Sequence, residues 1–209
     1  MKILKKHSIV KIFRENFAKN MLKNRVLQSS QMELYVVRHG QTYANLLGLC
    51  DSNIKENAKL TGLGIKQAEA AAIKLKKIKF DKMFVSELFR THQTGDIINK
   101  FHKLKYVQDS RLDDIETGFD GLPDADYQKA MREAKDKWNA RFNDGESFED
   151  RKKLIFDFLD DLKKKKYRRV LIVTHEHTIK VFRGYFENLS NEDMVKRKFK
   201  NCEILKFRL

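Results

Sequence analysis

Apolar and polar residues follow two different periods along this chain of 209 residues, and the two periods alternate from residue 32 onward. Short apolar runs rich in β-formers predict strands, whereas apolar residues spaced by three and four predict amphipathic helices. The predicted strands cover residues 34–37, 82–85, 106–107, 170–173 and 202–209. The predicted helices cover residues 64–77, 87–100, 124–138, 147–164 and 178–186.

This order of elements predicts an α/β fold. Alternating strands and helices are typical of a three-layer sandwich, with a mostly parallel central sheet and helices on both faces. The run Val170 to Val173 is apolar at every position, as expected of a central strand that is buried on both faces. Ligands of such sheets bind outside the carboxyl ends of the strands, so we expect the active site there.

Residues 1–31 are expected to form an extension, and residues 32–209 a single catalytic domain. Within the extension, Val10, Phe13, Phe17 and Met21 are spaced by three and four, which predicts a basic amphipathic helix. The segment lacks the apolar core of a secretory signal, and it is Lys-rich where transit peptides are rich in Arg and Ser. A true translation start at Met32, directly before the first strand, is the slightly favoured alternative.

The formal charge of +15 predicts anionic partners, because a basic protein attracts polyanions and acidic substrates. We nevertheless expect no nucleic acid, since no zinc-finger, RRM or KH signature is present. No uncharged apolar run approaches the ~18 residues of a membrane span, so stable membrane insertion is not expected. Cys50 and Cys202 form neither a disulfide framework nor a zinc-ligand pattern, which favours a reducing, cytoplasmic location.

Two strand ends carry candidate chemistry. The first strand runs into Arg38-His39-Gly40, and the strand 170–173 runs into Thr174-His175. A neutral imidazole is a nucleophile near physiological pH and can form a covalent phosphoryl intermediate. Phosphoryl transfer also needs cations around the phosphoryl oxygens, and the planar, permanently charged guanidinium group suits that role. Arg90, just after the second strand, is a further candidate.

These residues belong to a longer series of motifs that resembles the histidine phosphatase superfamily, in its phosphoglycerate mutase-like branch. The resemblance covers residues 32–209, and the motifs stand in the family's order. They are Arg38-His39-Gly40-Gln41-Thr42 with Asn45, Leu60-Thr61-Gly62-Leu63-Gly64, Ser86-x-x-x-Arg90-x-x-Gln93-Thr94, Gly145-Glu146-Ser147, Thr174-His175, and Asn201 before the last strand.

The resemblance implies the roles of the site residues. The catalytic residues would be His39 as the phosphorylated nucleophile, Asp114 as the general acid, and His175; the phosphate-binding residues would be Arg38, Asn45, Arg90 and His175. The family's acid is usually Glu in Leu-x-Glu, and here Leu112-Asp113-Asp114 places Asp114 at that position. The family's second histidine is usually followed by a small residue, and here Glu176 follows it. Neighbouring Asp113 and Glu116 are the next candidates for the acid.

The expected activity is that of a metal-independent phosphomonoesterase, acting through a phosphohistidine on a small phosphorylated metabolite and needing no cofactor. Two alternatives remain: phosphoryl transfer as in the family's mutases, and a catalytically inactive phosphate-binding module. Only about 25 residues separate Gly121 from Glu146, which favours an open site and hydrolysis over the enclosed site of a mutase. The segment 122–144 is expected to be a small cap over the pocket. We expect no metal at His175 and His177, and we place His177 on a helix surface.

Overall fold

The computed structural model describes residues 31–52 and 58–209. The extension predicted at residues 1–31 and its amphipathic helix therefore lie outside the described residues, apart from Gln31. The boundary of the catalytic domain at residue 32 stays a prediction. Within the part of the chain that is described, no helix is long and apolar enough to cross a membrane.

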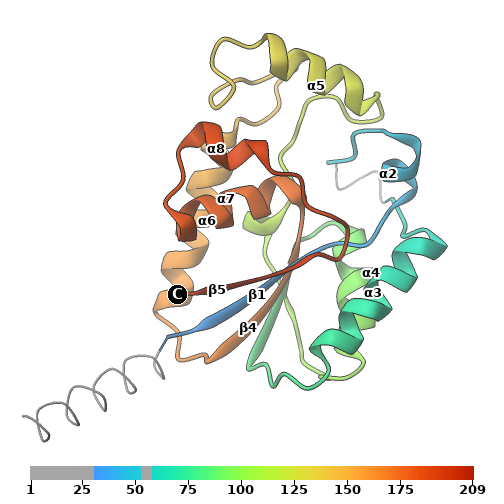
Figure 1. Ribbon diagram of the computed structural model, residues 1–209, viewed down its shortest axis with the longest axis vertical. Helices are drawn as coiled ribbons and strands as arrows, with labels where there is room; N and C mark the ends of the chain where they lie inside the picture. Colours follow the sequence, from blue (N-terminus) through green and yellow to red (C-terminus); the bar gives the residue numbers. More distant parts are fainter. Residues whose placement is uncertain (1–30, 53–57) are drawn as a thin grey trace, which may run out of the picture. The chain divides into compact units, whose positions relative to one another are not determined.

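Five strands of the described residues form one mixed sheet (Figure 1), in the order β3-β2-β4-β1-β5. Neighbouring pairs among the first four strands are parallel, and β5 runs antiparallel to β1 along the edge. The strands are β1 (Glu33–Arg38), β2 (Lys82–Val85), β3 (Val107–Gln108), β4 (Arg169–Thr174) and β5 (Ile204–Arg208). Each lies within one or two residues of its predicted position, and the mostly parallel sheet is confirmed.

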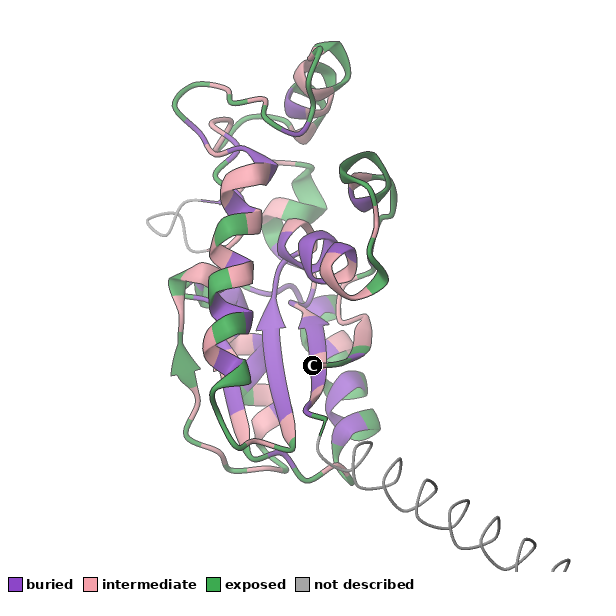
Figure 2. Ribbon diagram, turned by 90° about the vertical axis from the view of Figure 1, so that its left-hand side faces the viewer, coloured by how far each residue is buried: buried purple, intermediate pink, exposed green. Residues whose placement is uncertain are grey.

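Helices cover both faces of the sheet (Figure 1), which confirms the three-layer α/β fold. One face is covered by α3 (Gly62–Leu75) and α4 (Phe89–Asn99), and the other by α6 (Phe148–Lys163) and α7 (Glu176–Glu187). Figure 2 shows the buried residues concentrated on the central strands and on the helix sides that face them. This distribution follows from the alternation of side chains along a strand, which sends neighbouring residues to opposite faces.

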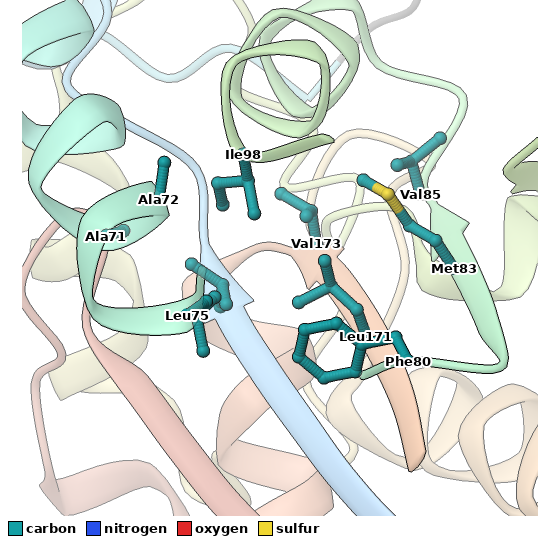
Figure 3. Packing of buried hydrophobic residues seen from close by; sticks show 10 residues of the cluster. Ala71, Ala72, Leu75, Phe80, Met83, Val85, Ile98, Leu171 and Val173 are labelled. Carbon is teal, nitrogen blue, oxygen red and sulfur yellow. The ribbon is translucent and has the colours of Figure 1, made fainter. Parts of the chain in front are cut away.

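Each face has its own apolar packing. Figure 3 shows Leu75 of α3 and Ile98 of α4 packed with Leu171, Val173 and Met83 of the sheet. On the opposite face, Phe84 of β2 makes an edge-to-face contact with Phe158 of α6, at 5.3 Å between ring centroids. A fully buried side chain of this size contributes about 1.5–3 kcal/mol, so the two helical layers hold the sheet between them.

Three short helical segments were not predicted: α2 (Tyr43–Leu47), the 3₁₀ helix η1 (Ser110–Leu112) and α8 (Asn191–Lys196). None is long enough to show a helical period in its apolar residues. Side-chain caps hold all three of them instead. Thr42 and Asn45 form a capping box at the start of α2, and Ser190 accepts the backbone N–H of Asp193 at the start of α8.

The helix predicted over residues 124–138 is shorter than predicted: α5 spans Asp124–Glu133. The side chain of Asp136 accepts the backbone N–H groups of Trp138 and Asn139, at 3.0 and 3.2 Å. Such a local bond replaces the helical hydrogen-bond ladder with a turn. The turn places Trp138 in a stack with Phe148, at 5.5 Å between ring centroids.

Candidate active site

His39 follows the last residue of β1, and a close backbone contact fixes it there. A Cβ atom at Gly40 would lie 2.6 Å from the carbonyl oxygen of Gly64, so only glycine allows this approach between the loop and α3. His39 Nδ1 lies 2.8 Å from the carbonyl oxygen of Gly40. A carbonyl only accepts, so Nδ1 carries the hydrogen and Nε2 carries the lone pair. Nε2 makes no hydrogen bond within the described residues.

The surroundings of His39 keep its ring neutral. The residue is 2% exposed and borders a pocket of the described structure. Burial lowers the pKa of His39 well below its ordinary value, and the positive charges of Arg90 and Arg38 lower it further. The imidazole is therefore unprotonated at neutral pH and available as a nucleophile.

The sheet register brings His175 beside His39. Arg38 and Thr174 are paired residues at the ends of β1 and β4, so the next residue of each strand emerges at the same edge. The two imidazole rings lie 5.1 Å apart between centroids. Arg90 donates from Nε to His175 Nδ1 at 3.3 Å, so His175 Nε2 carries the hydrogen and donates to Ser86 Oγ at 2.7 Å.

The two arginines proposed from the sequence, Arg38 and Arg90, lie beside these histidines. Arg90 is 3% exposed and donates from Nη2 to the backbone oxygen of Asp51 at 2.7 Å. Arg38 donates from Nη1 to Glu176 Oε2 at 2.7 Å and to the backbone oxygen of Phe199 at 2.5 Å. Hydrogen bonds thus hold both guanidinium groups in place before any ligand arrives, which reduces the entropy lost on binding a phosphate.

Asp114 is the carboxylate that reaches this cluster. Its loop is anchored by two hydroxyls, since Thr174 Oγ1 donates to the backbone oxygen of Leu112 at 2.5 Å and Thr178 Oγ1 to that of Asp113 at 2.6 Å. Asp114 Oδ2 lies 3.9 Å from both Arg90 Nη2 and His175 Nδ1. Burial alone would raise the pKa of Asp114, but His177, His175 and Arg90 together hold it well below its usual range.

The two alternative carboxylates point elsewhere. Asp113 Oδ1 accepts the backbone N–H of Glu87 at 2.7 Å, and burial raises the pKa of Asp113 to about 6. Glu116 is exposed, and neither residue lines the pocket. The structure therefore brings Asp114, and not its neighbours, to the histidine cluster.

Asn45 lies at the rim of the same pocket, on α2. Its Oδ1 accepts the backbone N–H of Thr42 and the Nδ2 of Asn201, each at 3.3 Å. Asn201 also donates to the backbone oxygen of His39 at 3.1 Å. The amide nitrogen of Asn45 makes no hydrogen bond within the described residues, so it remains available to a ligand oxygen.

The pocket has a volume of about 450 Å³, within the range of ~300–1,000 Å³ typical of small-molecule sites. All six predicted site residues border it or touch a residue that does: Arg38, His39, Asn45, Arg90, Asp114 and His175. From the segment 122–144, Asp124 and Gln128 of α5 line it. Its role as a cap stays a prediction.

Two residues of the site were missed or misplaced from the sequence alone. His177 was expected on a helix surface, and this expectation is wrong, because its Nδ1 lies 2.9 Å from Asp114 Oδ1. The physical reason is that α7 begins at Glu176, two residues earlier than predicted, which turns the first helical turn toward the pocket. Asp51, the partner of Arg90, follows no motif or period that would have identified it.

Neither the two cysteines nor the histidines form a metal site in the described residues. Cys50 and Cys202 are both free thiols. Across residues 31–52 and 58–209, no group of three or more His, Cys, Asp or Glu side chains is placed to hold a metal ion.

Comparison with known proteins identifies relatives of this chain. A zebrafish (Danio rerio) protein, "Probable fructose-2,6-bisphosphatase TIGAR A", is 36% identical over 160 residues, which make up 72% of this chain and 58% of that protein. The chain thus spans less than two thirds of that relative. The adenosylcobalamin/alpha-ribazole phosphatase of Escherichia coli is 27% identical over 154 residues, or 69% of this chain and 74% of that protein.

Solved structures share the fold. A mycobacterial glucosyl-3-phosphoglycerate phosphatase matches with a TM-score of 0.74 at 24% identity, covering 84% of this chain and 92% of that chain. A phosphoglycerate mutase of Bacillus anthracis matches with a TM-score of 0.74 at 20% identity, covering 87% and 89%. The model of the histidine phosphatase superfamily (branch 1) matches residues 34–209, and with the relatives above it shows that this chain belongs to the histidine phosphatase superfamily.

Proposed function

We propose that the chain is a phosphomonoesterase that transfers a phosphoryl group to His39 Nε2 and then to water, without a metal ion. The observation that carries the proposal is the fixed tautomer of His39. Its Nδ1–H is bound to Gly40, so the lone pair of a neutral, buried Nε2 borders a pocket lined by cations. A nucleophile in this state needs no separate base to activate it.

In the first step, Nε2 of His39 attacks the phosphorus atom and the ester P–O bond breaks. Arg38 and Arg90 neutralise charge on the phosphoryl oxygens, and the amide of Asn45 donates to one of them. The charges of these arginines replace those that a metal ion supplies in other phosphoryl-transfer sites. The leaving oxygen takes a proton from Asp114, whose Oδ2 faces Arg90 and His175.

In the second step, water attacks the phosphohistidine. Asp114, now a carboxylate, removes a proton from that water, and the P–N bond breaks to release inorganic phosphate and neutral His39. His175 lies against the ring of His39, and its Nδ1 faces Arg90 and the carboxylate of Asp114. Because both of its ring nitrogens are engaged, by Arg90 and by Ser86, we assign His175 the role of holding Arg90 against the transferred phosphoryl group in both steps.

The substrate class is a small phosphorylated metabolite. A pocket of about 450 Å³ accommodates a phosphate group together with a small organic group. The names of the relatives point the same way, since they describe a probable fructose-2,6-bisphosphatase and an adenosylcobalamin/alpha-ribazole phosphatase. Mostly polar lining residues such as Ser52, Thr117 and Gln128 suit hydroxylated esters.

The test is a panel of phosphomonoesters assayed with purified protein in EDTA. We expect phosphate release with EDTA present, an acid-labile phosphoenzyme, and loss of both in the His39→Ala variant. His102→Ala, a histidine outside the pocket, is the matched control and should retain activity. Turnover that requires an added divalent metal, or that survives in His39→Ala, would overturn the proposal. Transfer of the phosphoryl group to a second metabolite, instead of its release as inorganic phosphate, would identify a mutase.

A further inference from the structure

His177 occupies a distinctive place beside Asp114. Its Nδ1 lies 2.9 Å from Asp114 Oδ1, and that same oxygen accepts the backbone N–H of Ile115 at 3.1 Å. Two donors therefore hold Oδ1. The other oxygen, Oδ2, is the one turned toward Arg90 and His175, each at 3.9 Å. His177 and the backbone of Ile115 thus hold Oδ1 and leave Oδ2 on the side of Arg90 and His175.

The ring of His177 is itself held from neighbouring elements. Tyr127 of α5 lies perpendicular to it, at 6.1 Å between ring centroids, and Phe148 of α6 contacts it edge to face at 5.5 Å. Its side chain is only 16% exposed. Aromatic contacts of this kind favour one orientation of the ring, so Nδ1 remains directed at Asp114.

The short side chain of Asp114 needs a partner that holds it in position. Aspartate is one methylene shorter than the glutamate that its family usually carries at this position, so its carboxyl group has less reach. The hydroxyls of Thr174 and Thr178 fix the backbone of the preceding residues, Leu112 and Asp113. The remaining freedom is rotation of the Asp114 side chain, and the bond to His177 restricts it.

We propose that His177 is a positioning residue for the general acid of this reaction; the inference rests on the proposed function. As the ester P–O bond breaks, its electron pair stays on the leaving oxygen, which takes the proton from Asp114 Oδ2. Negative charge then appears on the carboxylate, and the bond from His177 Nδ1–H to Oδ1 becomes charge-assisted and stronger. An interaction that strengthens in the transition state raises kcat more than it lowers KM.

Two substitutions separate the hydrogen bond from the packing of the ring. His177→Asn keeps a donor close to the position of Nδ1 but removes the ring. His177→Phe keeps the ring between Tyr127 and Phe148 but removes the donor. The full chain is assayed with phenyl phosphate, whose leaving group needs a proton, and with p-nitrophenyl phosphate, whose leaving group scarcely does. His39→Ala and His102→Asn serve as the inactive and active controls.

We expect His177→Phe to lower kcat for phenyl phosphate roughly 10- to 100-fold, the effect of losing a hydrogen bond to a charged group. Its KM and its turnover of p-nitrophenyl phosphate should stay close to wild type, and His177→Asn should retain most of the activity. Equal losses on both esters, or a loss in His177→Asn but not in His177→Phe, would assign His177 to packing and overturn the inference. Wild-type turnover that is absent or independent of His39 would instead overturn the proposed function.

Discussion

At the scale of single residues, the site works because neighbouring groups set protonation states. His39 and His175 are both buried next to Arg90, and burial followed by that charge lowers the pKa of each well below its ordinary value. Asp114 lies among the same groups but is negatively charged when ionised, so they lower its pKa by attraction. In the free protein, two neutral imidazoles and one carboxylate therefore face each other. An arriving phosphate dianion repels that carboxylate and favours its protonated, acidic form.

The first prediction concerns Asp114. Asp114→Asn removes the proton donor, so turnover of alkyl phosphate esters should fall by about 10²–10⁴-fold. Turnover of p-nitrophenyl phosphate should fall far less, because its leaving group scarcely needs a proton. Steady-state kinetics with both substrates is the measurement. Equal losses would make Asp114 structural, and Asp113→Asn, which changes a carboxyl outside the pocket, is the matched control.

The second prediction concerns stability and pH. In the unfolded chain His39 and His175 bind protons below about pH 6.5, whereas in the folded protein their lowered pKa values keep them neutral. Their contribution to stability is therefore complete above pH 6.5 and is lost as pH falls below it, by about 1.4 kcal/mol per pH unit for each histidine. Asp113 has the opposite effect on stability, because burial raises its pKa in the folded protein to about 6. Between its pKa in the unfolded chain and about pH 6, its contribution to stability grows as pH falls.

Urea unfolding at pH 5, 6 and 7 in phosphate-free buffer measures this balance. The free energy of unfolding should fall from pH 7 to pH 5, and it should fall more steeply in Asp113→Asn, which lacks the opposing group. A free energy that stays constant or rises over this interval would show that the two histidines become protonated in the folded protein.

At the scale of elements, the site depends on how closely the His39 loop approaches α3. The backbone of Gln41 lies where a Cβ of Gly64 would stand, at 2.1 Å from its carbonyl oxygen. Gly62, two residues earlier at the start of the same helix, has nothing within 4 Å of its Cβ position. Gly62 and Gly64 thus occupy one motif for different physical reasons. Only Gly64 controls the position of the nucleophile.

The third prediction compares these two glycines. Gly64→Ala should separate α3 from the loop, lower the free energy of unfolding, and reduce kcat at least about tenfold by displacing His39, since small misplacements of a reacting group are costly. Gly62→Ala should leave activity unchanged. Activity with p-nitrophenyl phosphate and urea unfolding test both variants. Full activity in Gly64→Ala would mean that the loop adjusts without moving the histidine.

At the scale of the whole molecule, the sheet order gathers the site from distant parts of the chain. Because β2, β4 and β1 are neighbours, the segments after them carry Arg90, His175 and His39 to one edge of the sheet. The segment after η1 adds Asp114, and α2 adds Asn45. Every described residue that lines the pocket lies between Arg38 and Asn201.

The fourth prediction follows from that distribution. A chain that starts at Met32 should fold and retain most of the phosphatase activity of the full chain, because every motif of the family lies downstream of it. Circular dichroism and the p-nitrophenyl phosphate assay of both chains test this. Loss of folding or of turnover on truncation would show that residues 1–31 contribute to the domain or the site.

The sequence by itself determined the sheet and its flanking helices and identified the candidate site residues, because all of these rest on local patterns. Hydrophobic periods identify strands such as 170–173. A motif such as Arg38-His39-Gly40 indicates its chemistry because its functional groups are adjacent in the sequence. Short helices such as α2 and α8 were missed, because side-chain caps rather than a hydrophobic period hold them.

Only the tertiary structure decided how the site residues are partnered. The pairing of Arg90 with Asp51, of Arg38 with Glu176 and of Asp114 with His177 joins segments that are far apart in the chain or carry no motif. Tautomers and pKa shifts were equally beyond the sequence, since they depend on burial and on charges brought together by folding. A single sequence records which groups are present, and their distances arise from the packing of the elements that carry them.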